Sequence, residues 1–435
     1  MNLDFAPSLI NLVPMVAIWL VYLRNRKRRD AESARTLREA EEAGLTEPSS
    51  LHPIIDPARC LGCGTCVSAC PEGEILGLLH GKAVLVKPTS CIGHGACKDA
   101  CPQDAIRLVL GTKRRGVEVP VTNQQFETGV PGLFVAGEVT GMGLIRNAVA
   151  QGTLALNAAA EYSAGETSND RLDVVIVGVG PAGLAASLRA QELGLKFATF
   201  EQDTIGGTIA HYPRGKIVMT TPVELPGYGT VRLRETSKEA LLALWHEAIA
   251  ETGLRIETGQ RVKSISQDSE GLIIETSKGR YRTRAAILAI GRRGSPRQLG
   301  VPGEEQEKVV YRLIDAEQYA GKRVLVVGGG DSALEAAVSV SEQPGAEVTL
   351  CYRGDVFSRA KPDNRERVDA ASERGSLDVL MSTMPESIQP DTVRLDTGMG
   401  IKEISNDIVI VCIGGELPTG FLRDSGIDIE VRHGE

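Results

Sequence analysis

Two cysteine runs within residues 60–102 constrain this chain more than any other feature of its sequence. In both runs the ligand positions are separated by two, two and three residues, and a proline follows. The first run consists of Cys60, Cys63, Cys66 and Cys70. The second consists of Cys91, His94, Cys97 and Cys101, so a histidine stands where its second cysteine belongs. Thiolates at this spacing bind the irons of an iron–sulfur cluster, which the chain is therefore predicted to carry.

The frame resembles that of bacterial two-cluster ferredoxins, in which the fourth cysteine of each run ligates the other cluster. That resemblance implies a first 4Fe-4S cluster held by Cys60, Cys63, Cys66 and Cys101. It assigns the second site to Cys70, Cys91, Cys97 and, as a candidate, His94. Three states of the second site are open: a 3Fe-4S cluster with His94 as a filler, a 4Fe-4S cluster with His94 as its fourth ligand, or no cluster. An imidazole ligand would remove negative charge and raise the reduction potential.

Length, charge and cysteine usage limit the class of protein. The chain has 435 residues, enough for two or three domains. Its net charge of −8 argues against nucleic-acid binding. Seven of nine cysteines lie in the two runs, and Cys351 and Cys412 are expected to be buried apolar residues. Cysteines arranged as metal ligands indicate a reducing, cytosolic setting.

The amino-terminal residues predict a membrane anchor. Residues 5–23 carry no charge, and five basic residues follow within 24–29. A stretch of this length approaches the roughly 30 Å thickness of the hydrocarbon core, and the charge order opposes a signal peptide. We expect a single-pass helix in the cell (inner) membrane, with the catalytic body cytoplasmic. The alternative is an apolar helix packed on the protein or lying at the lipid interface.

Two dinucleotide-binding fingerprints follow. The first joins a buried strand to a helix through Gly178, Gly180, Pro181, Ala182 and Gly183. Glu201 ends the next strand, at the distance expected for a carboxylate that binds a ribose hydroxyl. The second fingerprint contains Gly328, Gly330, Ser332 and Ala333. Its second strand ends without an acid, and Arg353 and Arg359 favour NADP over NAD because they could bind a 2′-phosphate.

Residues 171–430 resemble the thioredoxin-reductase-like flavoproteins. The first fingerprint matches their FAD motif and the second their nicotinamide motif. Gly291 lies where the chain returns to the flavin. Gly206 and Gly207, followed by His211, resemble the flavin-covering segment of the bacillithiol-disulfide-reductase-like branch. The resemblance implies an α/β fold with two Rossmann-like domains, FAD, and NAD(P)H as a substrate.

The chain departs from that family in two places. Tyr311–Tyr319 stands where the redox-active Cys-x-x-C belongs and contains no cysteine, which excludes thioredoxin reduction by that route. The family's closing FAD segment is missing from the carboxyl end but resembles Val130–Ala150. This predicts a circular permutation in which Gly137 and Glu138 contact FAD. The alternative is that residues 130–141 form an unrelated strand and turn.

The domains are expected in this order: anchor (5–23), charged helical linker (24–50), α+β ferredoxin domain (51–110), displaced end of the FAD domain (111–164), FAD domain (171–302), NAD(P) domain (303–413) and return to the FAD domain (414–435). The predicted function is a membrane-anchored iron–sulfur flavoprotein oxidoreductase. It would pass electrons between NAD(P)H, FAD and the clusters to a one-electron carrier protein or a membrane redox subunit, as ferredoxin–NAD(P) reductases do. No side chain is predicted as a catalytic acid or base, and a homodimer is compatible with the sequence. The alternatives are a low-molecular-weight disulfide reductase and a non-catalytic membrane redox sensor.

Overall fold

The computed structural model describes the chain except for residues 1–5, 49–50, 165–170, 213, 215–216, 220–221, 234, 293, 295, 359 and 435, and the side chains of 6–13, 217, 219 and 235. The chain divides into two compact units. Unit 1 comprises residues 1–115 with 433–435, and unit 2 comprises residues 116–432. Each unit has its own buried core.

Unit 1 contains two antiparallel strand pairs and two short helices, as a two-cluster ferredoxin does. One pair joins β1 (His52–Ile55) to β4 (Ile106–Val109), and the other joins β2 (Leu76–Leu79) to β3 (Lys82–Leu85). The helices are α2 (Thr65–Ala69) and α3 (Ala96–Asp99), and η1 (Pro88–Ser90) precedes the second cysteine run. Three of the seven residues in its buried core are cysteines.

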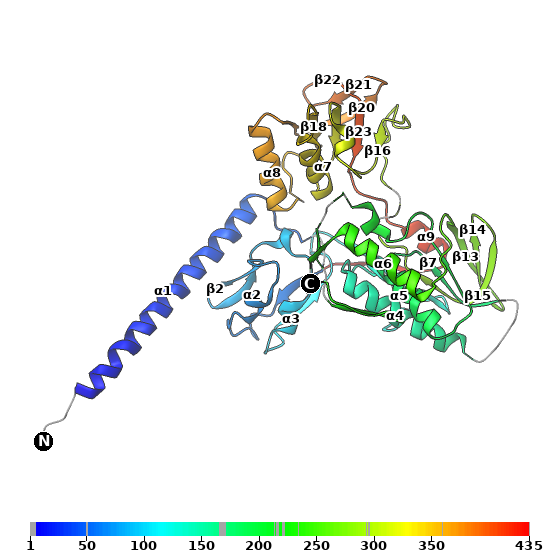
Figure 1. Ribbon diagram of the computed structural model, residues 1–435. Coiled ribbons are helices and arrows are strands. Elements are labelled where there is room, and N and C mark those ends of the chain that lie inside the picture. The colour runs from blue at the N-terminus through cyan, green and yellow to red at the C-terminus, as the bar shows by residue number, and fades with distance from the viewer. Residues whose placement is uncertain are drawn as a thin grey trace. The chain divides into compact units, whose positions relative to one another are not determined.

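A long helix, α1 (Ala6–Glu42), leads into this unit. Its carboxyl-terminal half packs on β2, where a side chain on Gly77 would collide with Ser33 (Figure 1). The charged segment expected as a linker is therefore in part a docked helix, because small residues allow close contact.

The structure does not support the transmembrane helix expected over residues 5–23. Among the described residues, no helix is long and apolar enough to cross a membrane. The side chains of residues 1–13 lie outside the described residues.

The first half of unit 2 is built on a mixed six-stranded sheet. Its strands are β6 (Leu133–Val135), β7 (Leu172–Val177), β8 (Phe197–Phe200), β13 (Val262–Asp268), β14 (Gly271–Thr276) and β15 (Arg280–Leu288). β6, β15, β7 and β8 run parallel, so their carboxyl ends meet at one edge. α4 (Ile145–Ser163) and α5 (Pro181–Glu192) pack on each other beside this sheet.

The segment predicted to be displaced, residues 111–164, contributes a strand to this sheet. β6 pairs with β15 in parallel, and β5 (Val117–Pro120) pairs with β24 (Ile429–Arg432) near the end of the chain. The remaining elements of this half are η2 (Glu138–Thr140), η3 (Gly207–His211), β9 (Ile217–Met219), β10 (Val223–Leu225), β11 (Gly229–Val231), β12 (Glu235–Ser237), α6 (Lys238–Thr252) and α9 (Thr419–Asp424).

The second half of unit 2 contains a five-stranded parallel sheet. Its order is β16 (Val309–Val310), β23 (Ile408–Val411), β17 (Arg323–Val327), β18 (Glu347–Cys351) and β19 (Leu377–Leu380). The helices α7 (Asp331–Ser341) and α8 (Pro362–Glu373) and a separate antiparallel sheet complete it, together with η4 (Glu317–Tyr319). That sheet consists of β20 (Met384–Ile388), β21 (Thr392–Asp396) and β22 (Ile401–Ser405). The predicted α/β class, with a ferredoxin-like domain and two Rossmann-like units, is confirmed.

Candidate functional site: two cluster cavities and a dinucleotide cradle

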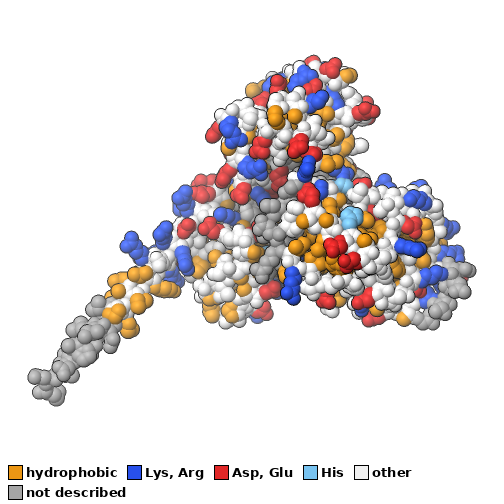
Figure 2. Space-filling view, in the orientation of Figure 1, with side chains coloured by type: hydrophobic (Ala, Val, Ile, Leu, Met, Phe, Trp, Pro, Cys, Tyr) orange, Lys and Arg blue, Asp and Glu red, His pale blue; other side chains and the backbone are white. Residues whose placement is uncertain are grey.

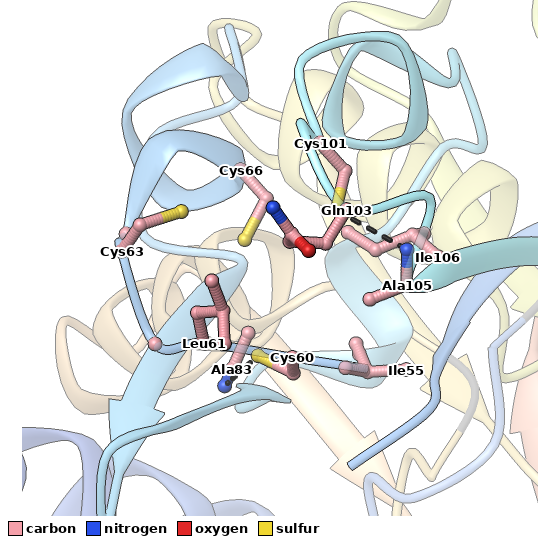
Figure 3. A pocket seen from close by; sticks show the side chains of 12 residues that line it. Ile55, Cys60, Leu61, Cys63, Cys66, Ala83, Cys101, Gln103, Ala105 and Ile106 are labelled. Atoms are coloured by element: carbon pink, nitrogen blue, oxygen red, sulfur yellow. Dashed lines mark hydrogen bonds between the residues drawn. The ribbon is translucent and has the colours of Figure 1, made fainter. Parts of the chain in front are cut away.

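A small cavity in unit 1 brings the first predicted ligand set together. Its walls include Cys60, Cys63, Cys66 and Cys101, although Cys101 belongs to the second run. In Figure 3 the four sulfur atoms surround a common space, with the Gln103 amide beside it. The structure thus brings Cys101 of the second run beside three cysteines of the first, as the crossed ligand set requires.

Glycines allow the first run to bend around this cavity. Gly62 has a φ of +69°, and a side chain there would collide with the carbonyl oxygen of Gly81. Gly64, with a φ of +79°, is the N-cap residue of α2. The backbone turn therefore directs Cys60, Cys63 and Cys66 to the same side.

Hydrogen bonds and burial set the chemistry of the first ligand set. The backbone N–H of Ala83 donates to Cys60 Sγ and that of Ala105 to Cys101 Sγ, both at 3.4 Å (Figure 3). Burial, followed by repulsion from Cys60, raises the pKa of the Cys66 thiol to about 11. Crowded thiols of this kind ionise when bound cations compensate their charge, and N–H···S bonds are a feature that tunes iron–sulfur clusters.

The ligand type of this set suits an iron–sulfur cluster, because all four of its members are thiols. Among the described residues, no three His, Cys, Asp or Glu side chains are placed to hold one metal ion. The cysteines of a 4Fe-4S cluster bind different irons, so their sulfurs lie farther apart than the ligands of one ion. Four thiols around one cavity therefore fit a 4Fe-4S cluster.

A second cavity contains the other predicted set. It is lined by Cys70, Cys91, Cys97 and His94. Burial raises the pKa of the Cys97 thiol to about 11, and burial also raises the pKa of Cys91 and Cys70. Gly95, with a φ of +87°, begins α3 as Gly64 begins α2. The second site therefore repeats the first, with an imidazole in place of one thiol.

The glycine turns predicted for FAD meet at the carboxyl edge of the parallel strands in unit 2. Gly137 follows β6, Gly178 follows β7 and Gly291 follows β15. A side chain on Gly183 would collide with the Gly178 carbonyl, and one on Gly137 would lie 2.9 Å from Ala182 Cβ. This edge, beside the amino terminus of α5, is where an open parallel sheet binds a dinucleotide.

Other predicted FAD residues lie around the same edge. Pro181 and Ala182 begin α5, and a side chain on Gly207 would lie 3.0 Å from the Cα of Gly180. Gly206 is the N-cap residue of η3, and Glu138 begins η2. His211 ends η3, and its Nε2 lies 3.3 Å from Asp203 Oδ2.

Glu201 is buried and already binds backbone. Its Oε2 accepts from the N–H of Val179 at 2.7 Å, and its Oε1 accepts from Asp203 at 3.0 Å. The carboxylate thus fixes the glycine loop, and each of its oxygens has a further lone pair for a ribose hydroxyl.

Gln151 in α4 is a candidate that the sequence analysis missed. Its side chain is buried, and Oε1 accepts from the N–H of Gly137 at 2.8 Å and from Thr140 Oγ1 at 3.1 Å. Its Nε2 is buried and has no hydrogen-bond partner in the protein. The next residue, Gly152, touches the Ala182 backbone at the start of α5. A buried amide donor beside an anion-binding helix terminus fits a bound FAD.

The residues predicted to bind the nicotinamide cofactor lie at the carboxyl edge of the second parallel sheet. Gly328 and Gly330 follow β17, Ser332 and Ala333 begin α7, and Arg353 is exposed just beyond β18. Arg359 lies outside the described residues. Tyr352, which we did not predict, covers Gly329, where a Cβ would come within 2.6 Å of the ring atom Cγ.

Comparisons with known proteins match both units. A family model described as pyridine nucleotide-disulphide oxidoreductase matches residues 175–433, and one described as 4Fe-4S dicluster domain matches residues 52–102. A ferredoxin–NADP reductase of Ignicoccus hospitalis is 31% identical over 218 residues, which cover 50% of this chain and 66% of that protein. The bacilliredoxin reductase Bdr of Bacillus subtilis is 27% identical over 266 residues, covering 60% and 82%.

A solved structure supports the same fold. The bacillithiol disulfide reductase of Staphylococcus aureus matches with a TM-score of 0.53 and 25% identity, covering 60% of this chain and 82% of that one.

Proposed function

Because this chain belongs, over residues 175–433, to the pyridine nucleotide-disulphide oxidoreductase family, we propose that it passes electrons between NAD(P)H and a one-electron carrier. The main support for this proposal is that one chain contains both a flavoprotein fold and a cavity lined by Cys60, Cys63, Cys66 and Cys101. The relative named ferredoxin–NADP reductase supports this reaction class.

The residues of the chain would bind and orient the groups. Bound FAD exchanges hydride with a nicotinamide and single electrons with iron–sulfur clusters. The turns at Gly137, Gly178 and Gly291 bring backbone close to a dinucleotide, and Glu201 holds the first turn in place. Arg353 supplies positive charge toward a 2′-phosphate, which favours NADPH. The N–H groups of Ala83 and Ala105 stabilise negative charge on the cluster sulfurs.

Turnover with and without the first cluster tests the proposal. We expect Cys60→Ala to abolish NADPH-driven reduction of a one-electron carrier protein while anaerobic flavin bleaching by NADPH continues. Carrier reduction at the wild-type rate in the variant would rule the route out.

A second candidate is reduction of a low-molecular-weight disulfide. It is favoured by the likeness to bacillithiol disulfide reductase. The segment directly before β17, Tyr311–Tyr319, contains no cysteine, so such a substrate would have to react at the flavin without the family's redox-active disulfide. NADPH oxidation driven by bacillithiol disulfide, and unaffected by Cys60→Ala, would favour this candidate.

We propose that the second cavity also holds a cluster. Three thiols and an imidazole line it, and it repeats the geometry of the first. EPR of the oxidised and reduced protein distinguishes the states, because the first cluster contributes one reduced signal. A 3Fe-4S cluster in the second site would add an oxidised signal, and a 4Fe-4S cluster would add a second reduced signal. The absence of both additional signals would show that the second site binds no cluster.

We further propose that the flavoprotein part is circularly permuted. The parallel pairing of β6 with β15 and the pairing of β5 with β24 support this, because Arg432 lies opposite Val117. A rearranged unit 2 that begins at residue 171 and joins 432 to 117 by a short loop should bind FAD. Failure to bind FAD in a folded product would contradict the proposal.

For location, we propose attachment of α1 to the cytoplasmic side of a cell membrane. Exposed apolar residues in α1 support this: Met15, Val16, Ile18, Trp19, Leu20, Val21 and Tyr22. Fractionation of cells with the full chain and with residues 1–23 deleted tests it. Equal amounts of both in the soluble fraction would refute it.

A further inference from the structure

The exposed edge of the first cluster site lies among cations that no step so far has used. We propose that this edge docks an acidic one-electron carrier protein, held by Arg26, Arg29, Arg59 and Lys82. The inference rests on the proposed function and names the chemistry of its partner.

Cys63 is the point where the ligands reach the surface. Of the eight predicted cluster ligands, all of which the structure describes, it is the one that is exposed. Leu61, which lines the same cavity, is 70% exposed. An exposed ligand beside an exposed apolar side chain is suited to a contact through which electrons pass.

Cations reach this edge from three segments of unit 1. The Arg26 guanidinium lies over Gly81, with an Nη atom 2.9 Å from where a Cβ would stand, and the Gly81 carbonyl contacts Gly62 in the cavity wall. Lys82 Nζ donates to the Cys60 carbonyl at 2.7 Å. Arg29 is one turn beyond Arg26 in α1.

The four proposed cations outnumber the two acidic residues, Asp56 and Asp104, that lie close to Arg59. Asp56 Oδ1 accepts from the N–H of Ala58 at 2.8 Å. Asp104 is accompanied by Arg59, whose Nη1 donates to its backbone oxygen at 3.3 Å. Residues 24–29 contain five basic and no acidic residues, although the chain as a whole carries −8. An acidic partner would be repelled by the molecule in general and attracted here, which gives orientation as well as rate.

An anionic bilayer would also attract cations, and Figure 2 shows Lys and Arg side chains on α1 next to its apolar part. However, Arg59 comes from a loop of the ferredoxin domain and Lys82 from the start of β3, on either side of Cys63 in the sequence. The cations therefore gather around the cluster cavity rather than along the helix alone. This distribution favours a protein partner that exchanges electrons at Cys63.

The test uses the full holoprotein and charge reversal. Oxidised protein is mixed in a stopped-flow instrument with a dithionite-reduced acidic [2Fe-2S] ferredoxin, over a range of ionic strength. We expect Arg26→Glu/Arg29→Glu to lower the second-order rate constant at least tenfold at low salt and to remove its salt dependence. The same variant should react faster than wild type with a basic cytochrome c after chemical reduction.

The matched control is Arg35→Glu/Arg38→Glu, which changes the net charge by the same amount farther along α1. At 1.5 Å per residue, Arg38 lies about 18 Å along the helix from Arg26. Arg35 pairs with Glu39, and Arg38 bonds the backbone of its own helix, so neither contacts the cluster site. If the substitutions shifted the reduction potential of the cluster, the rate constant would change by the same factor at every ionic strength. If they removed electrostatic attraction of the partner, the dependence of the rate constant on ionic strength would become less steep.

Three results would overturn the inference. One is an unchanged salt dependence in the Arg26/Arg29 variant, and another is an equal loss in the control. The third is loss of binding to vesicles rich in phosphatidylserine with no loss of the ferredoxin reaction. A separate experiment follows reduction of the clusters by NADPH in the wild-type protein. If NADPH does not reduce the clusters, the proposed function is contradicted, but the stopped-flow experiment still tests the docking surface.

Discussion

Gln151 carries the sharpest prediction at the scale of single residues. Its Oε1 holds the turn at Gly137, and its buried Nε2 has no protein partner. A hydrogen bond to a charged group contributes about 1.5–3 kcal/mol, so Gln151→Glu, which replaces the donor by a repelling carboxylate, should weaken FAD binding at least tenfold. The FAD content after gel filtration and a flavin-fluorescence titration measure this.

Thr140→Val is the matched control for Gln151, because it removes a partner of Oε1 and leaves Nε2 untouched. FAD binding near the wild-type level is expected in this control. Equal FAD affinity in Gln151→Glu and the wild type would show that the amide does not contact the cofactor.

His94 gives a second residue-scale prediction. His94→Cys completes the four-thiol set around the second cavity, so this site should hold a 4Fe-4S cluster in the variant. A fourth thiolate adds negative charge, and the midpoint potential of the second site should therefore fall relative to wild type. EPR-monitored redox titration measures it. A second site whose signal and potential are identical in variant and wild type would contradict the prediction.

The site residues differ in how far sequence alone could predict them. The placement of Cys101 beside Cys60 follows from a fixed spacing, because local turns determine where the thiols point. Gln151 and Tyr352 lie outside any motif, and their importance depends on which glycine each meets in the folded chain. For Gln151, the one feature of the sequence that could have indicated a role is the presence of a glutamine in an alanine-rich helix.

At the scale of elements, an ion pair joins the starts of β17 and β23. Arg323 Nε and backbone N–H donate to Asp407 Oδ2, and Nη2 donates to Oδ1 at 2.5 Å. The bond from Arg323 lowers the pKa of Asp407 to about 2. Because the folded-state pKa is below the ordinary value, the stabilisation is present above about pH 4 and is lost as the pH falls toward 2.

We therefore expect Asp407→Asn to lower the protection of these two strands at pH 7, by no more than about 1 kcal/mol because both side chains are partly exposed. Hydrogen exchange of peptides covering 323–327 and 408–411 measures the difference. The difference between variant and wild type should shrink at pH 2.5. A difference that grows as the pH falls would contradict the assignment.

Elements with strong periodic or motif signals were predictable, and their partners were not. The strand–glycine–helix units at Gly178 and Gly328 lie where the motifs place them. The segment 24–50 was expected to be a linker, yet α1 packs on β2 through Ser33 and Gly77. A close contact between small residues leaves no hydrophobic pattern in the sequence.

At the scale of the whole molecule, the two units differ in what holds them together. Unit 2 contains several extended apolar clusters. Among the described residues of unit 1, the apolar cluster has seven buried members, and three of them, Cys60, Cys66 and Cys97, are predicted ligands. A core this small rarely stabilises a domain without a metal group, so unit 1 should depend on its clusters and unit 2 should not.

Calorimetry of the full chain should accordingly show two transitions. Anaerobic chelation of iron should abolish the one belonging to unit 1 and leave that of unit 2, with its FAD, within a few degrees. Two cysteine truncations provide a matched pair. Cys60→Ala should affect the first transition alone, whereas Cys351→Ala, which opens a cavity at a fully buried position of β18, should lower the second alone. A single transition that shifts with iron content would show instead that the clusters stabilise both units, and that the electron-transfer domain and the flavoprotein fold as one.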